Sequence, residues 1–219
     1  QGLHSVKALD KKKRNFLIAA GIPLIHPLVD LGNYVMLEMG TPMHVFDLDH
    51  LELPLNIVFP ASKKNSFQAI GGNTKIVEPS SLTIQDQKGI QGIAGIIGGH
   101  ETSVSKNTKS VAVEAAFFNP DKIANQARKY GLATDASHRF ERGVDPALQQ
   151  KALARFLFLL KEIAQYDLMD CYEGSSVKLK PIAISLSVKR FNHFSGLLLS
   201  AKKIKLFLET LGFISMINK

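Results

Sequence analysis

The run VAVEAAFF at residues 111–118 constrains the fold more than any other part of the chain. Seven of its eight residues are apolar, so a strand built from it would be apolar on both faces. Such a strand is expected in the centre of a sheet, covered on both sides. The exception is Glu114, because a carboxylate is costly to bury without a partner. Glu114 lies either in a pocket, where it can accept a hydrogen bond from a ligand, or at a strand end that faces water.

Short β-prone runs separated by glycine turns predict that most of residues 55–118 forms strands. The runs before residue 111 are LNIVFP (55–60), TKIVEP (74–79), SLTIQD (81–86) and GIAGIIGG (92–99). The glycines of the last run favour a tight turn with positive φ. The alternative is that the missing side chains let a ligand approach the backbone N–H groups. The run is neither a Walker loop nor a Rossmann fingerprint, since it lacks GKS or GKT and a clear βαβ context.

Helices are predicted on both sides of this region. A short helix is expected over residues 12–20, and the apolar stretch 28–40 is either helix or strand. The sequence Asn119-Pro120-Asp121 indicates a helix start, and that helix should run to about Tyr130 and end at Gly131. A long helix should follow Pro146, where apolar residues recur at the spacing of a core-facing stripe: Leu153, Phe156, Leu157, Leu160 and Ile163.

These elements predict an α+β fold, with a β-sheet core flanked by helices and a small partial helical module at the C-terminus. The composition shifts at 173–176, so residues 1–172 are expected to form one domain. Residues 173–219 would be a linker and the truncated start of a further module. Within it, SLSVKRFNHFSG and SAKKIKLFLETLGF predict two short helices, with Ser200 capping the second and Gly212 ending it.

Charge and cysteine content limit the class of protein. The net charge is +8, from 27 basic and 19 acidic residues, which fits either a polyanionic partner or simple solubility. The single Cys171 excludes an internal disulfide and favours a reducing compartment. No apolar stretch approaches the ~20 residues that span a bilayer, and the N-terminus lacks the apolar core of a signal peptide. Because the chain begins at Gln1 and ends in an irregular segment, we expect it to be a fragment of something longer.

Few residues carry a chemical signature from their spacing alone. His44 follows Gly40-Thr41-Pro42 and is expected in a turn, where a lone histidine is more often structural. No set of His, Cys and carboxylate residues has metal-ligand spacing, so no metal site is predicted. The charged run SHRFERGVD (137–145) is expected to form a salt-bridge network that fixes a loop between two helices.

Four stretches together resemble the β subunit of bacterial phenylalanyl-tRNA synthetase. They are GNYVMLEMGTPMHVFDLD (32–49), GIAGIIGG (92–99), VEAAFFNP (113–120) and GLATDASHRFERGVDP (131–146). The resemblance implies that residues 20–165 belong to the editing domain of that family, an α+β unit that hydrolyses mischarged tyrosyl-tRNA(Phe). Residues 181–219 resemble the first part of the next module of that subunit.

The resemblance also implies roles for matched positions. Glu114 would recognise the para-hydroxyl of tyrosine, and the backbone of Gly95 would face the ligand. The implied catalytic positions are His44, Asn33 and Gly95, and the implied substrate-binding positions are Glu114, Thr134, Ala136 and Pro42. One position departs from the family, which commonly has Thr-Asn where this chain has Gly32-Asn33. The hydroxyl expected near the substrate ester or water is therefore missing.

The function that follows is hydrolysis of an aminoacyl ester by direct water attack, since no Ser–His–Asp triad is evident. No cofactor is expected in this fragment, whereas ATP and Mg²⁺ would serve the full synthetase. The implied partners are tRNA(Phe) and the synthetase α subunit of an α2β2 heterotetramer, in the cytoplasm. The alternative is a non-catalytic module that binds tRNA or scaffolds the synthetase.

Overall fold

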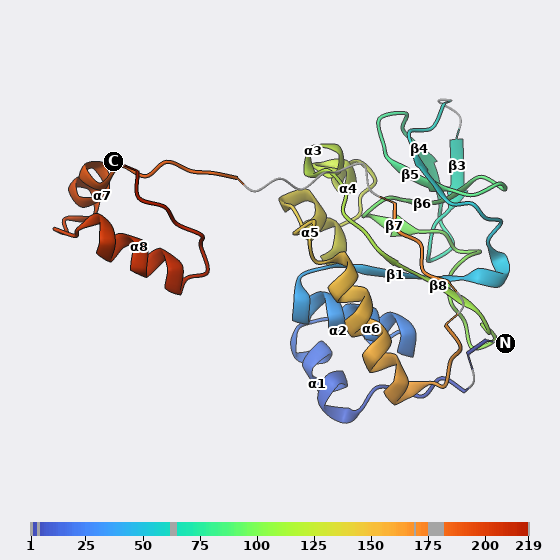
Figure 1. The fold of residues 1–219 in the computed structure, drawn as a ribbon. Coiled ribbons are helices and arrows are strands. Elements are labelled where there is room, and N and C mark those ends of the chain that lie inside the picture. The colour runs from blue at the N-terminus through green and yellow to red at the C-terminus, as the bar shows by residue number, and fades with distance from the viewer. Residues whose placement is uncertain (1, 4, 62–64, 169, 175–181, 219) are drawn as a thin grey trace. The chain divides into compact units, whose positions relative to one another are not determined.

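The computed structural model describes residues 2–3, 5–61, 65–168, 170–174 and 182–218. The chain divides into two compact units, Gln1–Gly174 and Ser175–Lys219 (Figure 1). The linker predicted at 173–176 lies in part outside the described residues.

Three helices form one layer of the first unit: α1 (Lys11–Ala19), α2 (Pro27–Met39) and α6 (Gln149–Ile163). The stretch 28–40, for which helix and strand were both open, is therefore a helix. Its start is fixed locally, since Pro27 occupies the first turn and the His26 side chain accepts a hydrogen bond from the Leu28 N–H. Helix α2 packs against α6 and against the first strand.

The strands β1 (Met43–Asp47) and β8 (Val111–Ala115) pair antiparallel and cross the unit between the helices and the β-rich part (Figure 1). Side chains alternate across this ribbon. Val45 and Val113 pack into the helical cluster, whereas Phe46 and Ala112 pack into the β-rich cluster. Both faces are thus covered, as the run 111–118 predicted. The prediction of a central strand was wrong, because β8 pairs with β1 alone among the described strands and ends at Ala115.

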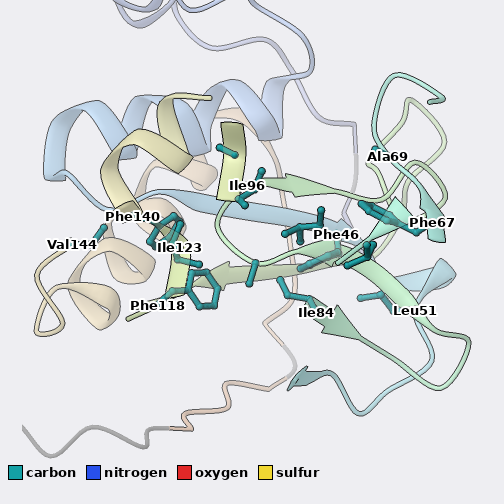
Figure 2. Close-up of a cluster of buried hydrophobic side chains, with 14 residues drawn as sticks. Phe46, Leu51, Phe67, Ala69, Ile84, Ile96, Phe118, Ile123, Phe140 and Val144 are labelled. Carbon is teal, nitrogen blue, oxygen red and sulfur yellow. The ribbon is translucent and has the colours of Figure 1, made fainter. Parts of the chain in front are cut away.

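The β-rich part holds two further antiparallel sheets. One has the order β2-β5-β6-β7, from β2 (Asn56–Val58), β5 (Thr83–Gln85), β6 (Ile90–Ile93) and β7 (Ile97–Gly98). The other pairs β3 (Asn65–Gln68) with β4 (Thr74–Val77). A 3-10 helix, η1 (Leu48–His50), follows β1. Their shared core includes Phe46, Ile84, Ile96, Phe118 and Phe140 (Figure 2). The α+β class and the four β-prone runs are confirmed, while β1 and β3 were not predicted.

The segment after β8 differs from its prediction. The helix expected from Pro120 to Tyr130 is two short helices, α3 (Pro120–Ile123) and α4 (Gln126–Lys129), because Asn125 has a positive φ of 62°. The charged run 137–145 lies largely in α5 (Asp135–Arg142) and not in a loop. Thr134 and Ser137 form a reciprocal capping box that starts this helix.

The second unit contains α7 (Val188–Ser195) and α8 (Ala201–Thr210), as predicted. Ser187 and Ser200 cap the two helices through their side chains. The Asn192 amide holds the connection by bonding both the N–H and the C=O of Leu199. No helix in the described part of the chain is long and apolar enough to cross a membrane.

Candidate functional site

The ribbon of β1 and β8 brings His44 opposite Glu114. Directly opposed residues of an antiparallel pair point to the same side, with Cβ atoms about 4.5–5.5 Å apart. The expectation that His44 lies in a turn was wrong, because it is the second residue of a strand. Both side chains are half-buried, and neither makes a hydrogen bond or ion pair with another described residue. The imidazole Nε2 is itself buried and unpartnered.

Burial alone sets the protonation of both groups. Desolvation raises the pKa of Glu114 to about 7 and lowers the pKa of His44 to about 4. At neutral pH His44 is therefore an uncharged imidazole, and Glu114 is divided between its acid and carboxylate forms. Unpaired groups with strongly shifted pKa values are characteristic of functional sites.

The β6–β7 hairpin lies against His44, and two of its glycines are required for different reasons. Gly95 has a φ of +69°, and a Cβ on it would lie 2.9 Å from Cδ2 of Phe140. Gly98 has no positive φ, but its Cβ would lie 2.6 Å from Cε1 of His44. The turn predicted from glycine is confirmed at Gly95. At Gly98 the missing side chain admits the His44 ring, which also packs edge-on against Phe46 with ring centroids 4.3 Å apart.

The N-terminus of α5 lies against the tip of the same hairpin. The Thr134 hydroxyl donates to the carbonyl of Ile96 at 3.3 Å and accepts the N–H of Ser137 at 3.0 Å. Ala136, half-buried, packs against the β-rich core and also against a small cluster on α1 and α2. Thr134, Ala136 and Gly95 are thus neighbours in the fold, although they come from two distant segments.

Asn33 and Pro42 are less directly connected to this group. Met36 and Leu37 follow Asn33 by three and four residues, so they share its face of α2. They belong to the cluster that contains Ala136, so this face is directed towards α5. Pro42 is buried immediately before β1. No described contact joins either residue to His44 or Glu114.

A cavity of about 200 Å³ lies beside His44, and sequence reasoning did not find it. It is lined by Ile25, His26, Val29, Gly32, Met43, His44, Val45, Ile70, Ser103 and Val104. The one sequence signal that could have indicated it is a glycine in the interior of α2. An open groove of about 390 Å³ on α1 and α2 contains none of the predicted site residues.

The charged side chains of the run 137–145 pair with neighbours on α5, whereas its Phe140 contacts Gly95. Arg139 pairs with Asp135 at 2.9 Å and Arg142 with Glu141 at 3.1 Å, both on α5. Cys171 is exposed. Among the described residues, no three His, Cys, Asp or Glu side chains are grouped as metal ligands.

Comparison with known proteins identifies the family. The B3/4 domain family matches residues 4–165. The phenylalanine–tRNA ligase beta subunit of Francisella tularensis is 42% identical over 180 residues, covering 81% of this chain and 22% of that protein. The same subunit of Dickeya dadantii is 37% identical over 214 residues, covering 97% and 27%. This chain spans about a quarter of the length of these relatives.

A crystal structure of an N-terminal fragment of the phenylalanyl-tRNA synthetase beta subunit from Pyrococcus horikoshii superimposes with a TM-score of 0.44 and 16% identity, covering 96% of this chain and 59% of that one. The resemblance stated from the four sequence stretches is confirmed by the family match and by the relatives. The chain belongs to the B3/4 domain family, and the relatives that it matches over most of its length are phenylalanine–tRNA ligase beta subunits.

Proposed function

We propose that this chain is the editing domain of a phenylalanyl-tRNA synthetase β subunit and hydrolyses mischarged tyrosyl-tRNA(Phe). The observation that carries the proposal is Glu114, an unpaired and largely desolvated carboxyl group that faces His44 across the ribbon. A fold keeps such a group against its desolvation penalty when the group has a ligand to bind. The phenolic hydroxyl of tyrosine is a ligand of the right polarity.

Specificity follows from this burial. A pocket selected for phenylalanine rejects an analogue that only adds a hydroxyl by a factor on the order of 100. A second site that requires the hydroxyl can discriminate by ~10⁴ or more, because phenylalanine would leave its buried polar group unpaired. Glu114 is that group, and the site spares phenylalanyl-tRNA because it binds phenylalanine poorly.

In the proposed mechanism, water attacks the aminoacyl ester directly. His44, with its pKa lowered to about 4, is neutral at physiological pH and too weak a base to hold a proton. It therefore positions the water as a hydrogen-bond acceptor, together with the Asn33 amide. The backbone N–H of Gly95 stabilises the developing oxyanion, since the N–H groups of Ala94 and Ile96 already donate to Leu82 and Ile93. Thr134, Ala136 and Pro42 form the walls that hold the amino acid.

The remaining assignments concern the parent enzyme. As part of a phenylalanine–tRNA ligase, the chain would act with the α subunit of an α2β2 heterotetramer in the cytoplasm. ATP and Mg²⁺ would serve aminoacylation elsewhere in that complex. The tRNA substrate agrees with the net charge of +8.

Hydrolysis of tyrosyl-tRNA(Phe) by the variants Glu114→Gln and His44→Ala tests the proposal. Both should lose most of the activity, and the exposed Glu101→Gln should retain it. Phenylalanyl-tRNA(Phe) should survive incubation with the unaltered chain. Full activity in both site variants would show that the site is elsewhere.

The second candidate, a non-catalytic tRNA-binding or scaffolding module, is favoured by the positive charge alone. It predicts that the chain binds tRNA with a steep dependence on salt and leaves the ester intact. Measuring binding and deacylation on the same preparation separates the two functions.

A further inference from the structure

Gly32 occupies a position where glycine is unexpected. It is the sixth residue of the 13-residue helix α2, and glycine is among the least favourable residues in a helix interior. Its backbone is not left-handed, so conformation does not require glycine. Crowding does not require it either, because a Cβ would meet nothing closer than Cβ of Met43 at 3.4 Å, an ordinary contact. The missing side chain therefore needs another explanation.

The space in front of Gly32 is the cavity beside His44. Its volume is about 200 Å³, enough for a sugar or base ring with its substituents. Its walls are mainly apolar and include no carboxylate, lysine or arginine. The polar side chains are Ser103 and two histidines, and burial lowers the pKa of both His26 and His44. Such walls suit an uncharged ring and not a phosphate.

His44 belongs both to the pair with Glu114 and to the wall of the cavity. His44 is opposite Glu114 in the ribbon and also lines the cavity, whereas Glu114 does not line it. If the tyrosyl group binds Glu114, the scissile ester lies at His44. The next part of the substrate is the uncharged ribose and base of the terminal nucleoside.

We infer that Gly32 keeps open a compartment for the alcohol half of the ester, and that this compartment takes the terminal ribose of the tRNA. This inference rests on the proposed function and adds the place of the leaving group. Gly32 is a specificity-determining residue because it forms part of the cavity wall beside Met43, where added side-chain atoms would reduce the space for the ribose. The helix is less stable for its presence, and the compartment is larger.

Two esters with the same tyrosyl group and different alcohols test the alcohol half of the site alone. They are 2′(3′)-O-tyrosyl-adenosine and tyrosine methyl ester. On the 219-residue chain, Gly32→Ala should raise the melting temperature through helix propensity. It should also lower hydrolysis of tyrosyl-adenosine on the order of ten-fold more than hydrolysis of the methyl ester. Gly32→Val should widen this difference. The control Asn15→Ala, at an exposed position of α1, should raise the melting temperature and leave the ratio of the two rates unchanged.

Three results would overturn the inference. A higher melting temperature with an unchanged ratio would mean that the cavity is not used. Equal losses on both esters would place the acyl half there. A lower melting temperature would mean that packing requires the glycine.

The inference survives a failure of the proposed function, because binding is measured separately from hydrolysis. If the chain cleaves neither ester, editing is refuted, but adenosine should still shift the NMR signals of His44 and Met43, and Gly32→Val should abolish the shift. Free tyrosine should leave the Met43 signal unchanged. An adenosine titration that moves neither signal would refute the compartment.

Discussion

Replacement of Glu114 by glutamine should remove a pH dependence from the stability of the chain. The pKa of Glu114 in the fold is about 7, above its ordinary value of 4.5, because burial disfavours the carboxylate. The folded state therefore binds the proton more tightly than the unfolded state. The contribution of protonated Glu114 to the free energy of unfolding is complete below pH 4.5 and is lost as the pH rises through 7.

The magnitude follows from the shift of the pKa. A difference of about 2.5 units corresponds to roughly 3 kcal/mol at 1.36 kcal/mol per unit. Between pH 5 and pH 8 the loss is about 2.5 kcal/mol, since part of the ionisation in the unfolded state is complete at pH 5. For a chain of this size, that loss lowers the melting temperature by about 5–10 °C. Glutamine keeps the shape and cannot ionise, so Glu114→Gln should be nearly flat over this range.

Urea denaturation from pH 5 to pH 8.5 measures the effect directly. The free energies of unfolding of the unaltered chain and of Glu114→Gln should diverge as the pH rises, with the variant the more stable at pH 8. Glu101→Gln, which changes an exposed carboxylate, should run parallel to the unaltered chain. If Glu114→Gln also runs parallel to it, Glu114 is solvated or paired, and the basis for hydroxyl recognition is lost.

Two further variants test the burial of His44 and the structural role of Thr134. For His44, whose pKa is lowered from 6.5 to about 4, stability is present above pH 6.5 and is lost as the pH falls through 4, by roughly 3 kcal/mol. His44→Leu should therefore flatten the acid limb of the same denaturation profile, and an unchanged acid limb would contradict the burial of the ring. Thr134→Ala removes both the N-cap of α5 and the bond to Ile96, so it should lower the free energy of unfolding by about 1 kcal/mol. Thermal unfolding beside Ser200→Ala, which removes a cap from the second unit alone, shows whether any loss belongs to the first unit.

Local patterns were sufficient for elements whose signals lie within a few residues. The β-prone runs, the stripe after Pro146 and the Ser200 cap of α8 are all signals of this kind. The break at Asn125 was not predictable, because an asparagine in the left-handed region leaves no periodic signature. The start of α5 was also missed, since the capping box of Thr134 uses Ser137 where Glu or Gln is the usual partner.

The candidate site was less accessible to sequence reasoning, for a geometric reason. His44 and Glu114 are 70 positions apart, and the register of two distant strands cannot be read from either strand alone. Shifting that register by one residue would turn one side chain to the opposite face. The family resemblance supplied a list of positions, and the ribbon supplies the physical relation between two of them.

Three residues at this site each carry an energetic cost at their position in the fold. Gly32 weakens a helix, Glu114 resists ionisation, and His44 keeps a buried Nε2 without a partner. Natural sequences agree with their fold at most positions and depart from it where function requires. The three residues come from three different elements, α2, β1 and β8, and Gly32 and Glu114 both lie beside His44. The opposite signs of the expected effects, stability gained and ester hydrolysis lost, distinguish a site maintained for a ligand from a poorly packed core.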